Sequence, residues 1–289
     1  INSVFMKTLI IIPSRLGATR LPGKPLLKIN NKSIISHVFK RAQDADIGDV
    51  VVATENTEIV EDVTMNGGRA ILTSKEHKTG TDRIYEAFKK MKFNDVDLIM
   101  NLQGDEPAIN IEDIVSLKDK MINYQSKMGT LAAKVENKKD FQNENIVKVQ
   151  TKSNLQEDSF SEAEAFSRIS KKLDNVYHHI GIYCYSVETL EKFVQLNQTE
   201  NEIEQRLEQL RALPTSTKLN AASAKSPPPP PASPSHRVET TSPRPATRAT
   251  PASAPATTTT PPASQRTARS TIFSPRWRPT SCAPGCSNT

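Results

Sequence analysis

Residues 7–13, KTLIIIP, and residues 14–25, SRLGATRLPGKP, combine a short apolar run with a basic loop. An Ile-rich run of this length is typical of a β-strand buried on both faces of a sheet. The loop holds two glycines and three cations: Gly17, Gly23, Arg15, Arg20 and Lys24. Glycines allow successive backbone N–H groups to converge on an anion, and open α/β sheets bind phosphates in loops that follow a strand. The stretch therefore predicts a phosphate-binding loop at a sheet edge, and a cationic surface loop is the alternative.

The basic charge of the chain is concentrated in its last quarter. The 289 residues carry a formal net charge of +6, but residues 214–289 hold nine basic residues and one acidic residue. The preceding 213 residues are therefore slightly acidic, which gives no reason to expect a nucleic-acid partner. No run approaches the roughly 18–20 apolar residues of a membrane span. Three cysteines imply no disulfide framework and fit a reducing, cytoplasmic compartment.

Residues 214–289 also differ from the rest of the chain in composition. They hold 16 of the 20 prolines, together with many Ser, Thr, Ala and Arg residues. Such a segment cannot bury enough apolar surface to offset its ordering entropy, so we expect a disordered, low-complexity tail after a domain over residues 6–213. The abrupt change is typical of a reading-frame change or a chimeric gene. A Pro-rich ligand for a peptide-binding module is the alternative.

Apolar patterning predicts strands and helices that alternate at short spacing. Buried strands are expected over residues 50–54, 69–73, 96–102, 130–135, 146–149 and 178–185, and helices over residues 33–46, 55–66, 81–91, 111–125 and 202–213. This alternation predicts an α/β fold with a mostly parallel sheet and helices on both faces.

Residues 101–107, NLQGDEP, follow the strand predicted over residues 96–102. Gly104 permits a close backbone approach and Pro107 ends the strand. Asp105 offers a carboxylate to a hard cation such as Mg²⁺. Because ligands bind at the carboxyl ends of strands in such sheets, this segment is a candidate site, and an ordinary turn is the alternative.

Residues 79–83, TGTDR, open a predicted helix. Thr81 can cap this helix, and the N–H groups of its first turn together with Arg83 favour an anion. The alternative is an ordinary capped helix with an exposed arginine. Further along, residues 178–185 alternate like a strand, and residues 202–213 read as a charged amphipathic helix.

Together these segments resemble the sugar-acid cytidylyltransferases, above all those that use 3-deoxy-manno-octulosonate (KDO), over residues 6–213. The matching motifs are R-x-x-x-T-R-L-P-G-K-P, L-Q-G-D-E-P, T-G-T-D-R, F-S-R, H-x-G-I-Y and L-E-Q-L-R. The resemblance implies a three-layer α/β nucleotidyltransferase fold and a homodimer. It also implies transfer of CMP from CTP to KDO, with release of pyrophosphate, in bacterial lipopolysaccharide biosynthesis.

The same resemblance assigns roles to individual residues. The implied nucleotide-binding residues are Ser14, Arg15, Lys24 and Gln103. The implied sugar-binding residues are Arg83, Gln103, His179, Tyr183, Glu208 and Gln209. Arg15, Lys24 and Asp105 are the implied catalytic residues, and Asp105 is the implied Mg²⁺ ligand.

The resemblance stops after Leu213. Family members continue with a V-D-T-P-E-D-L motif that supplies a second carboxylate to the metal, and this motif is missing from the sequence. Residues 218–227 keep only a faint similarity to the strand that precedes it. We therefore expect little activity from the chain as written. An inactive remnant that binds CTP or nothing, and a cytidylyltransferase for another sugar acid, are the alternatives.

Overall fold

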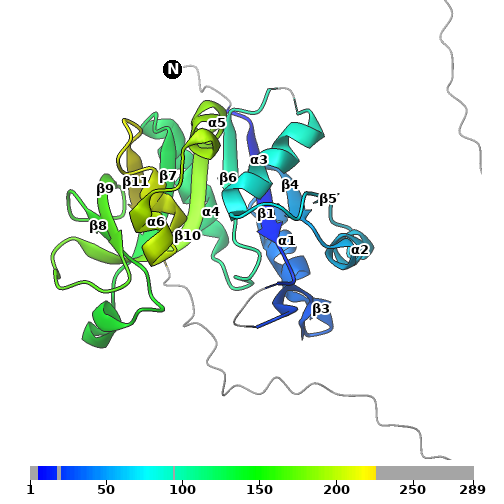
Figure 1. Ribbon diagram of the computed structural model, residues 1–289, viewed down its shortest axis with the longest axis horizontal. Coiled ribbons are helices and arrows are strands. Elements are labelled where there is room, and N and C mark those ends of the chain that lie inside the picture. Colours follow the sequence, from blue (N-terminus) through cyan, green and yellow to red (C-terminus); the bar gives the residue numbers. More distant parts are fainter. Residues whose placement is uncertain (1–5, 18–20, 94, 226–289) are drawn as a thin grey trace, which may run out of the picture. The chain divides into compact units, whose positions relative to one another are not determined.

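A nine-stranded mixed sheet forms the centre of the structure (Figure 1). The computed structural model describes residues 6–17, 21–93 and 95–225. The strands are ordered β5-β4-β1-β6-β10-β7-β11-β9-β8. Their bounds are β1 Thr8–Ser14, β4 Gly48–Thr54, β5 Ala70–Leu72, β6 Leu98–Asn101, β7 Met128–Ala133, β8 Lys148–Thr151, β9 Phe160–Ser167, β10 Val176–Ser186 and β11 Leu219–Ser223. A separate two-stranded ribbon consists of β2 (Lys28–Ile29) and β3 (Lys32–Ser33).

Helices cover both faces of this sheet. Those on one face are α1 (Ile34–Asp44), α2 (Thr57–Met65) and α4 (Ile111–Asn123), and those on the other are α3 (Gly80–Met91) and α5 (Val187–Gln195). Strand β1 contributes Ile10 and Ile12 to the first core and Leu9 and Ile11 to the second. The two cores confirm the three-layer α/β fold, and they explain why the Ile run is apolar at every position.

The sheet is parallel over β5, β4, β1 and β6, which is the part that the expectation of a mostly parallel sheet describes correctly. Beyond β6 the sheet is mixed. Strand β10 is antiparallel to β6, β7 and β8, and β9 is antiparallel to β8 and β11. Strands β8 and β9 follow one another through a short loop, and such loops join antiparallel strands, whereas parallel strands need a long crossover.

The carboxyl-terminal part of the described chain differs from the sequence-based expectation in two ways. The helix expected over residues 202–213 is wrong as a continuous helix: α6 (Glu200–Gln205) ends at Arg206, whose φ is 55°, and a 3₁₀ turn, η3 (Glu208–Arg211), follows. In addition, β11 lies beyond Leu213 and pairs with both β7 and β9. The last strand of the sheet thus comes from the segment with only a faint family similarity. Most of the expected low-complexity tail, residues 226–289, lies outside the described residues.

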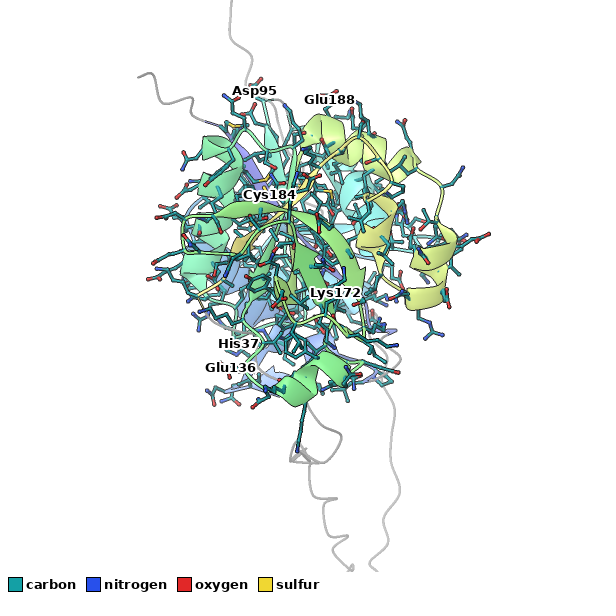
Figure 2. The ribbon with its side chains drawn as sticks, turned by 90° about the vertical axis from the view of Figure 1, so that its left-hand side faces the viewer. His37, Asp95, Glu136, Lys172, Cys184 and Glu188 are labelled. Atoms are coloured by element: carbon teal, nitrogen blue, oxygen red, sulfur yellow. The ribbon has the colours of Figure 1, made fainter. Side chains whose placement is uncertain are left out.

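Figure 2 shows at which end of the sheet three labelled side chains lie. Asp95, just before β6, and Glu188, just after β10, lie at its upper end. Glu136, which follows β7, lies at the lower end. Cys184 is buried within β10 and is a free thiol.

Because β1 and β6 run parallel, their carboxyl ends meet at one edge of the sheet, where the candidate site lies. Within the described residues, no helix has both the length and the apolar character that crossing a bilayer requires.

Candidate active site

A cleft of about 270 Å³ opens where β1 and β6 end. It is lined by Pro13, Ser14, Arg15, Lys24, Pro25, His77, Lys78, Thr79, Gly80, Arg83, Gln103, Gly104 and Asp105. Segments around residues 14, 24, 80 and 104, which are far apart in the sequence, thus meet in one cavity. All the predicted nucleotide-binding and catalytic residues line this cleft. Arg20, the third cation of the first loop, lies outside the described residues.

The loop after β1 folds back on itself by backbone hydrogen bonds. The Gly23 N–H donates to the Leu16 carbonyl at 3.0 Å, and Gly23 has a φ of 72°, which glycine adopts without strain. The Leu16 N–H donates to Asn56 Oδ1 at 3.0 Å, which ties the loop to the start of α2. Lys24 then begins a short 3₁₀ turn, Lys24–Leu26. These contacts place the ammonium group of Lys24 at the cleft.

Lys24 and Asp105 form an ion pair across the cleft. Lys24 Nζ lies 2.8 Å from Asp105 Oδ2, and the two side chains are 28% and 52% exposed. An exposed carboxylate of this kind is free to exchange its partner for a ligand, because partly exposed ion pairs contribute little stability. Burial, followed by the neighbouring Asp105 carboxylate, raises the pKa of Glu106 to about 7. Glu106 is therefore only partly ionised near neutral pH.

Gly104 lets the two strand ends approach each other closely. A Cβ atom at this position would lie 2.8 Å from the Pro13 carbonyl oxygen and 3.3 Å from Ser14 Cβ. Any larger residue would therefore push the loop after β6 away from the end of β1.

Ser14 carries a buried hydroxyl that has no hydrogen-bond partner among the described residues. Buried polar atoms are almost always paired, so an unpaired one beside a cleft is a candidate to bind a water molecule or a ligand atom. This observation fits the predicted nucleotide-binding role of Ser14.

Gln103 is held in a fixed orientation at the wall of the cleft. Its Nε2 donates to the Gly181 carbonyl at 2.9 Å. This bond assigns Nε2 as the donor end, which leaves the amide oxygen of Gln103 free to accept a hydrogen bond from a ligand.

Arg83 lines the cleft but is already heavily engaged by the protein. Its Nη1 donates to Thr73 Oγ1 at 2.6 Å and to the Ser74 carbonyl at 3.1 Å, and its Nη2 pairs with Glu55. The side chain is only 3% exposed. Of the five N–H groups of a guanidinium, two are left for an anion. Its role in binding the sugar acid thus stays a prediction.

His179 and Tyr183 lie next to the cleft, in β10, rather than on its wall. Both are buried, and their ring centroids are 5.4 Å apart. Burial lowers the pKa of His179 to about 3, so its imidazole is neutral, and burial also raises the pKa of Tyr183. They connect to the cleft through Gly181, which lies between them in sequence and accepts the bond from Gln103.

Glu208 and Gln209 belong to the 3₁₀ turn η3, next to the start of α3. Burial raises the pKa of Glu208, and the nearby hydroxyls of Thr81 and Thr79 partly oppose this. Thr79 itself lines the cleft. Glu208 Oε1 is buried without a hydrogen-bond partner among the described residues, as Ser14 Oγ is. Gln209 is buried.

Two features of the cleft were not predicted from the sequence. His77 and Lys78 line it from the loop between β5 and α3. Glu86, in the second turn of α3, accepts from His77, from the Ser74 N–H at 2.8 Å and from Lys90 at 2.5 Å. The position of His77 and Lys78 in the sequence could have indicated this. They precede a predicted helix, and in such folds the loop before a helix lies at the same sheet edge as the carboxyl ends of the parallel strands.

Among the described residues that line the cleft, Asp105 is the carboxylate that a metal ion would contact. No cluster of three or more His, Cys, Asp or Glu side chains suited to a metal occurs in the described residues. One exposed carboxylate fits Mg²⁺, which is usually held by one or two carboxylates together with substrate phosphates and water. It does not suit an ion that needs a cage built only from protein.

Comparisons with known proteins agree with this geometry. Residues 9–219 match the family model described as Cytidylyltransferase. The 3-deoxy-manno-octulosonate cytidylyltransferase of Thermodesulfovibrio yellowstonii is 43% identical over 226 residues, which cover 74% of this chain and 89% of that protein. A 3-deoxy-manno-octulosonate cytidylyltransferase of Actinobacillus pleuropneumoniae is 42% identical over 217 residues, covering 72% of this chain and 86% of that protein.

A solved structure of CMP:2-keto-3-deoxy-manno-octonic acid synthetase complexed with CTP superposes with a TM-score of 0.68 at 32% identity. The superposed region covers 77% of this chain and 92% of the synthetase chain. An apo UDP-glucose pyrophosphorylase shares the fold, with a TM-score of 0.56 at 14% identity over 75% of this chain and 90% of its own. The chain therefore belongs to the cytidylyltransferase family, among the 3-deoxy-manno-octulosonate cytidylyltransferases.

Proposed function

We propose that this chain transfers CMP from CTP to KDO, giving CMP-KDO and pyrophosphate for lipopolysaccharide biosynthesis. The observation that carries the proposal is the cleft, where Ser14, Arg15, Lys24, Gln103 and Asp105 converge from separate segments. Family membership supports the same reaction. Relatives that share about 40% identity over most of their length are named 3-deoxy-manno-octulosonate cytidylyltransferases.

The reaction is an in-line displacement at phosphorus. The anomeric hydroxyl oxygen of KDO forms a bond to the α-phosphorus of CTP, and the bond between that phosphorus and the oxygen bridging to the β-phosphate breaks. The hydroxyl proton passes to solvent, and pyrophosphate leaves. Such chemistry depends on positioning and on neutralising charge rather than on covalent catalysis.

The residues of the cleft supply both requirements. Arg15 and Lys24 hold the triphosphate and neutralise the charge that develops on pyrophosphate. Ser14 donates its unpaired hydroxyl to a nucleotide oxygen. Gln103 lies between the nucleotide and the sugar, while His179, Tyr183, Glu208, Gln209 and Arg83 bind the sugar acid. Asp105 would hold Mg²⁺, which supplies charge neutralisation at the phosphates when bound.

The site also explains why we expect weak activity from this chain. The described residues offer Mg²⁺ the carboxylate of Asp105, which is paired with Lys24. A single carboxylate binds Mg²⁺ less tightly than two do, since charge count sets much of the affinity. We further propose a homodimer in the cytoplasm, and sedimentation velocity of the purified chain tests the dimer.

Two measurements on the purified chain test the function. Calorimetric titration with CTP in Mg²⁺ reports the nucleotide site, and pyrophosphate release over long incubations reports turnover. We expect CTP to bind to the chain. We also expect pyrophosphate to be released slowly, and only when both KDO and Mg²⁺ are present. Absence of CTP binding would overturn the nucleotide site, and release with another sugar acid but not with KDO would favour the other substrate.

The variant Asp105→Asn tests the metal site. We expect it to need on the order of tenfold more Mg²⁺ for half-maximal release, because it removes a charged oxygen ligand. Asp174→Asn is the matched control, since Asp174 is exposed and lies outside the cleft. If Asp105→Asn needs no more Mg²⁺ than the unmodified chain, Asp105 does not bind the metal and belongs to an ordinary turn.

A further inference from the structure

The hydroxyl of Thr130, in the middle of β7, contacts three groups of the neighbouring strand β10. It lies 2.6 Å from the Ile182 carbonyl oxygen, 3.2 Å from the Ile180 carbonyl oxygen and 3.0 Å from His179 Nε2. Thr130 is fully buried at 0% exposure. Water therefore does not compete for these contacts.

Counting protons assigns the tautomer of His179. A threonine hydroxyl has one proton to donate, and carbonyl oxygens can only accept. The Thr130 proton is therefore directed to the nearer carbonyl, that of Ile182 at 2.6 Å, so the hydroxyl oxygen must accept from the ring. His179 Nε2 then carries the hydrogen, and the other ring nitrogen, Nδ1, presents a lone pair.

The same contacts coincide with an irregularity in β10. Pairing between β7 and β10 shifts register between Ile180 and Tyr183. Within this bulge, Ile180 and Ile182 direct their carbonyls to Thr130, and Gly181 directs its carbonyl to Gln103 Nε2 at 2.9 Å. Bulges next to functional sites commonly re-aim side chains and backbone groups.

Packing fixes the plane of the His179 ring. Phe166 meets it edge to face, with centroids 5.0 Å apart and an interplanar angle of 82°. Tyr183 lies on it at 5.4 Å and 48°. A ring held between two aromatics, with Nε2 bonded to Thr130, has one orientation for Nδ1. Within the described residues no protein group hydrogen bonds to Nδ1.

We propose that Thr130 is a positioning residue for the sugar acid: it fixes His179 with hydrogen on Nε2, so that Nδ1 accepts a hydrogen bond from a sugar hydroxyl. The inference rests on the proposed function, because it takes the ligand of His179 to be KDO. It adds a residue that does not line the cleft and is not expected to touch the substrate.

Thr130→Val and Thr130→Ser separate the hydroxyl from the shape of the side chain. Valine keeps the branched shape and removes the donor, and serine keeps the hydroxyl. Nitrogen-15 NMR of histidine-labelled protein reports the tautomer, with the His179 signals assigned by their loss in His179→Gln. We expect hydrogen on Nε2 in the unmodified chain and in Thr130→Ser, and a mixed or reversed tautomer in Thr130→Val.

Titration with KDO in the presence of CTP measures the consequence for binding. We expect Thr130→Val to weaken KDO binding about tenfold, the effect of one lost or misdirected hydrogen bond, and to leave the affinity for CTP alone unchanged. Thr130→Ser should restore KDO binding. A tautomer unchanged in Thr130→Val, or KDO affinity equal to that of the unmodified chain, overturns the proposal. A purely structural role predicts instead that Thr130→Val weakens CTP and KDO alike.

Failure of the proposed function gives a different pattern. In that case the unmodified chain fails to bind KDO at all, while the NMR signals still report whether Thr130 sets the tautomer of His179. The two failures are therefore distinguishable.

Discussion

Glu86→Gln tests how the loop that brings His77 and Lys78 to the cleft is held. The Glu86 carboxylate accepts from the Ser74 N–H, from His77 and from Lys90, so it joins this loop to α3. Glutamine keeps the size of the side chain but removes its charge. We expect the variant to fold with lower stability and with a loosened loop.

The size of the effect follows from the pKa of Glu86. Burial alone would raise this pKa, but hydrogen bonds from Lys90, His77 and the Ser74 N–H outweigh it and hold the value at about 2, against an ordinary 4.5. Since one pKa unit corresponds to about 1.4 kcal/mol, the difference is worth about 3 kcal/mol at neutral pH. The side chain is 21% exposed, so solvent screening reduces the expected loss to about 2 kcal/mol.

The dependence on pH has a definite sign. The folded-state pKa of Glu86 lies below its unfolded value, so the stabilisation is present above pH 4.5 and is lost as the pH falls toward 2. Between about pH 7 and about pH 4 the unmodified chain should lose about 0.8 kcal/mol through this group. The glutamine of Glu86→Gln does not titrate in this pH range. The difference in free energy of unfolding between the unmodified chain and Glu86→Gln should therefore be about 0.8 kcal/mol smaller at pH 4 than at pH 7.

Urea denaturation at both pH values measures this gap. Glu61→Gln is the matched control, because Glu61 is an exposed carboxylate of α2, and its replacement should change stability by less than about 0.5 kcal/mol. The reasoning fails if Glu86→Gln is no less stable than Glu61→Gln at neutral pH. It also fails if the gap stays constant on acidification.

Three further changes test other contacts. Lys24→Ala should weaken CTP binding on the order of tenfold in calorimetry while the thermal midpoint stays nearly unchanged, because its ion pair is partly exposed; unchanged CTP affinity would contradict its phosphate role. Gly104→Ala should cost about 1–3 kcal/mol in urea denaturation and weaken CTP binding, because its Cβ would lie 2.8 Å from the Pro13 carbonyl oxygen; a neutral effect would show that the strand ends can separate freely. Arg211→Met should cost about 3–5 kcal/mol because it leaves Glu202, 3% exposed, without its charged partner, and adding Glu202→Met should recover much of this loss; equal stability of single and double variants would argue against that cause.

The parallel half of the fold was predictable because its signals are local. The Ile run of β1 is apolar at every position, as burial on both faces requires, and the following loop is basic. The mixed half was less predictable. Nothing in the periodicity of residues 202–213 shows that Arg206 adopts a left-handed conformation. A continuous helix would separate Glu202 from Arg211 by about 13 Å, whereas the break at Arg206 brings their side chains to 2.5 Å.

For the cleft, the sequence identified residues that carry recognisable motifs and missed those that support them. Lys24 and Asp105 were found because their motifs are distinctive, and they do meet. Glu86 and Thr130 were missed because each acts through a contact set by tertiary structure: one with the loop before its own helix, the other across two strands. Such partners have no fixed spacing in sequence.

The position of β11 has a consequence for how the chain folds during synthesis. Strand β11 is the last element to leave the ribosome among those described, yet it is an interior strand, paired with β7 on one side and β9 on the other. Until it arrives, the edges of β7 and β9 that β11 later pairs with remain open, and unpaired edges invite association with other chains. Residues after Leu213 are thus not a dispensable end of the domain. A stop codon placed between Leu213 and Leu219 would remove a strand from within the sheet and expose two edges at once.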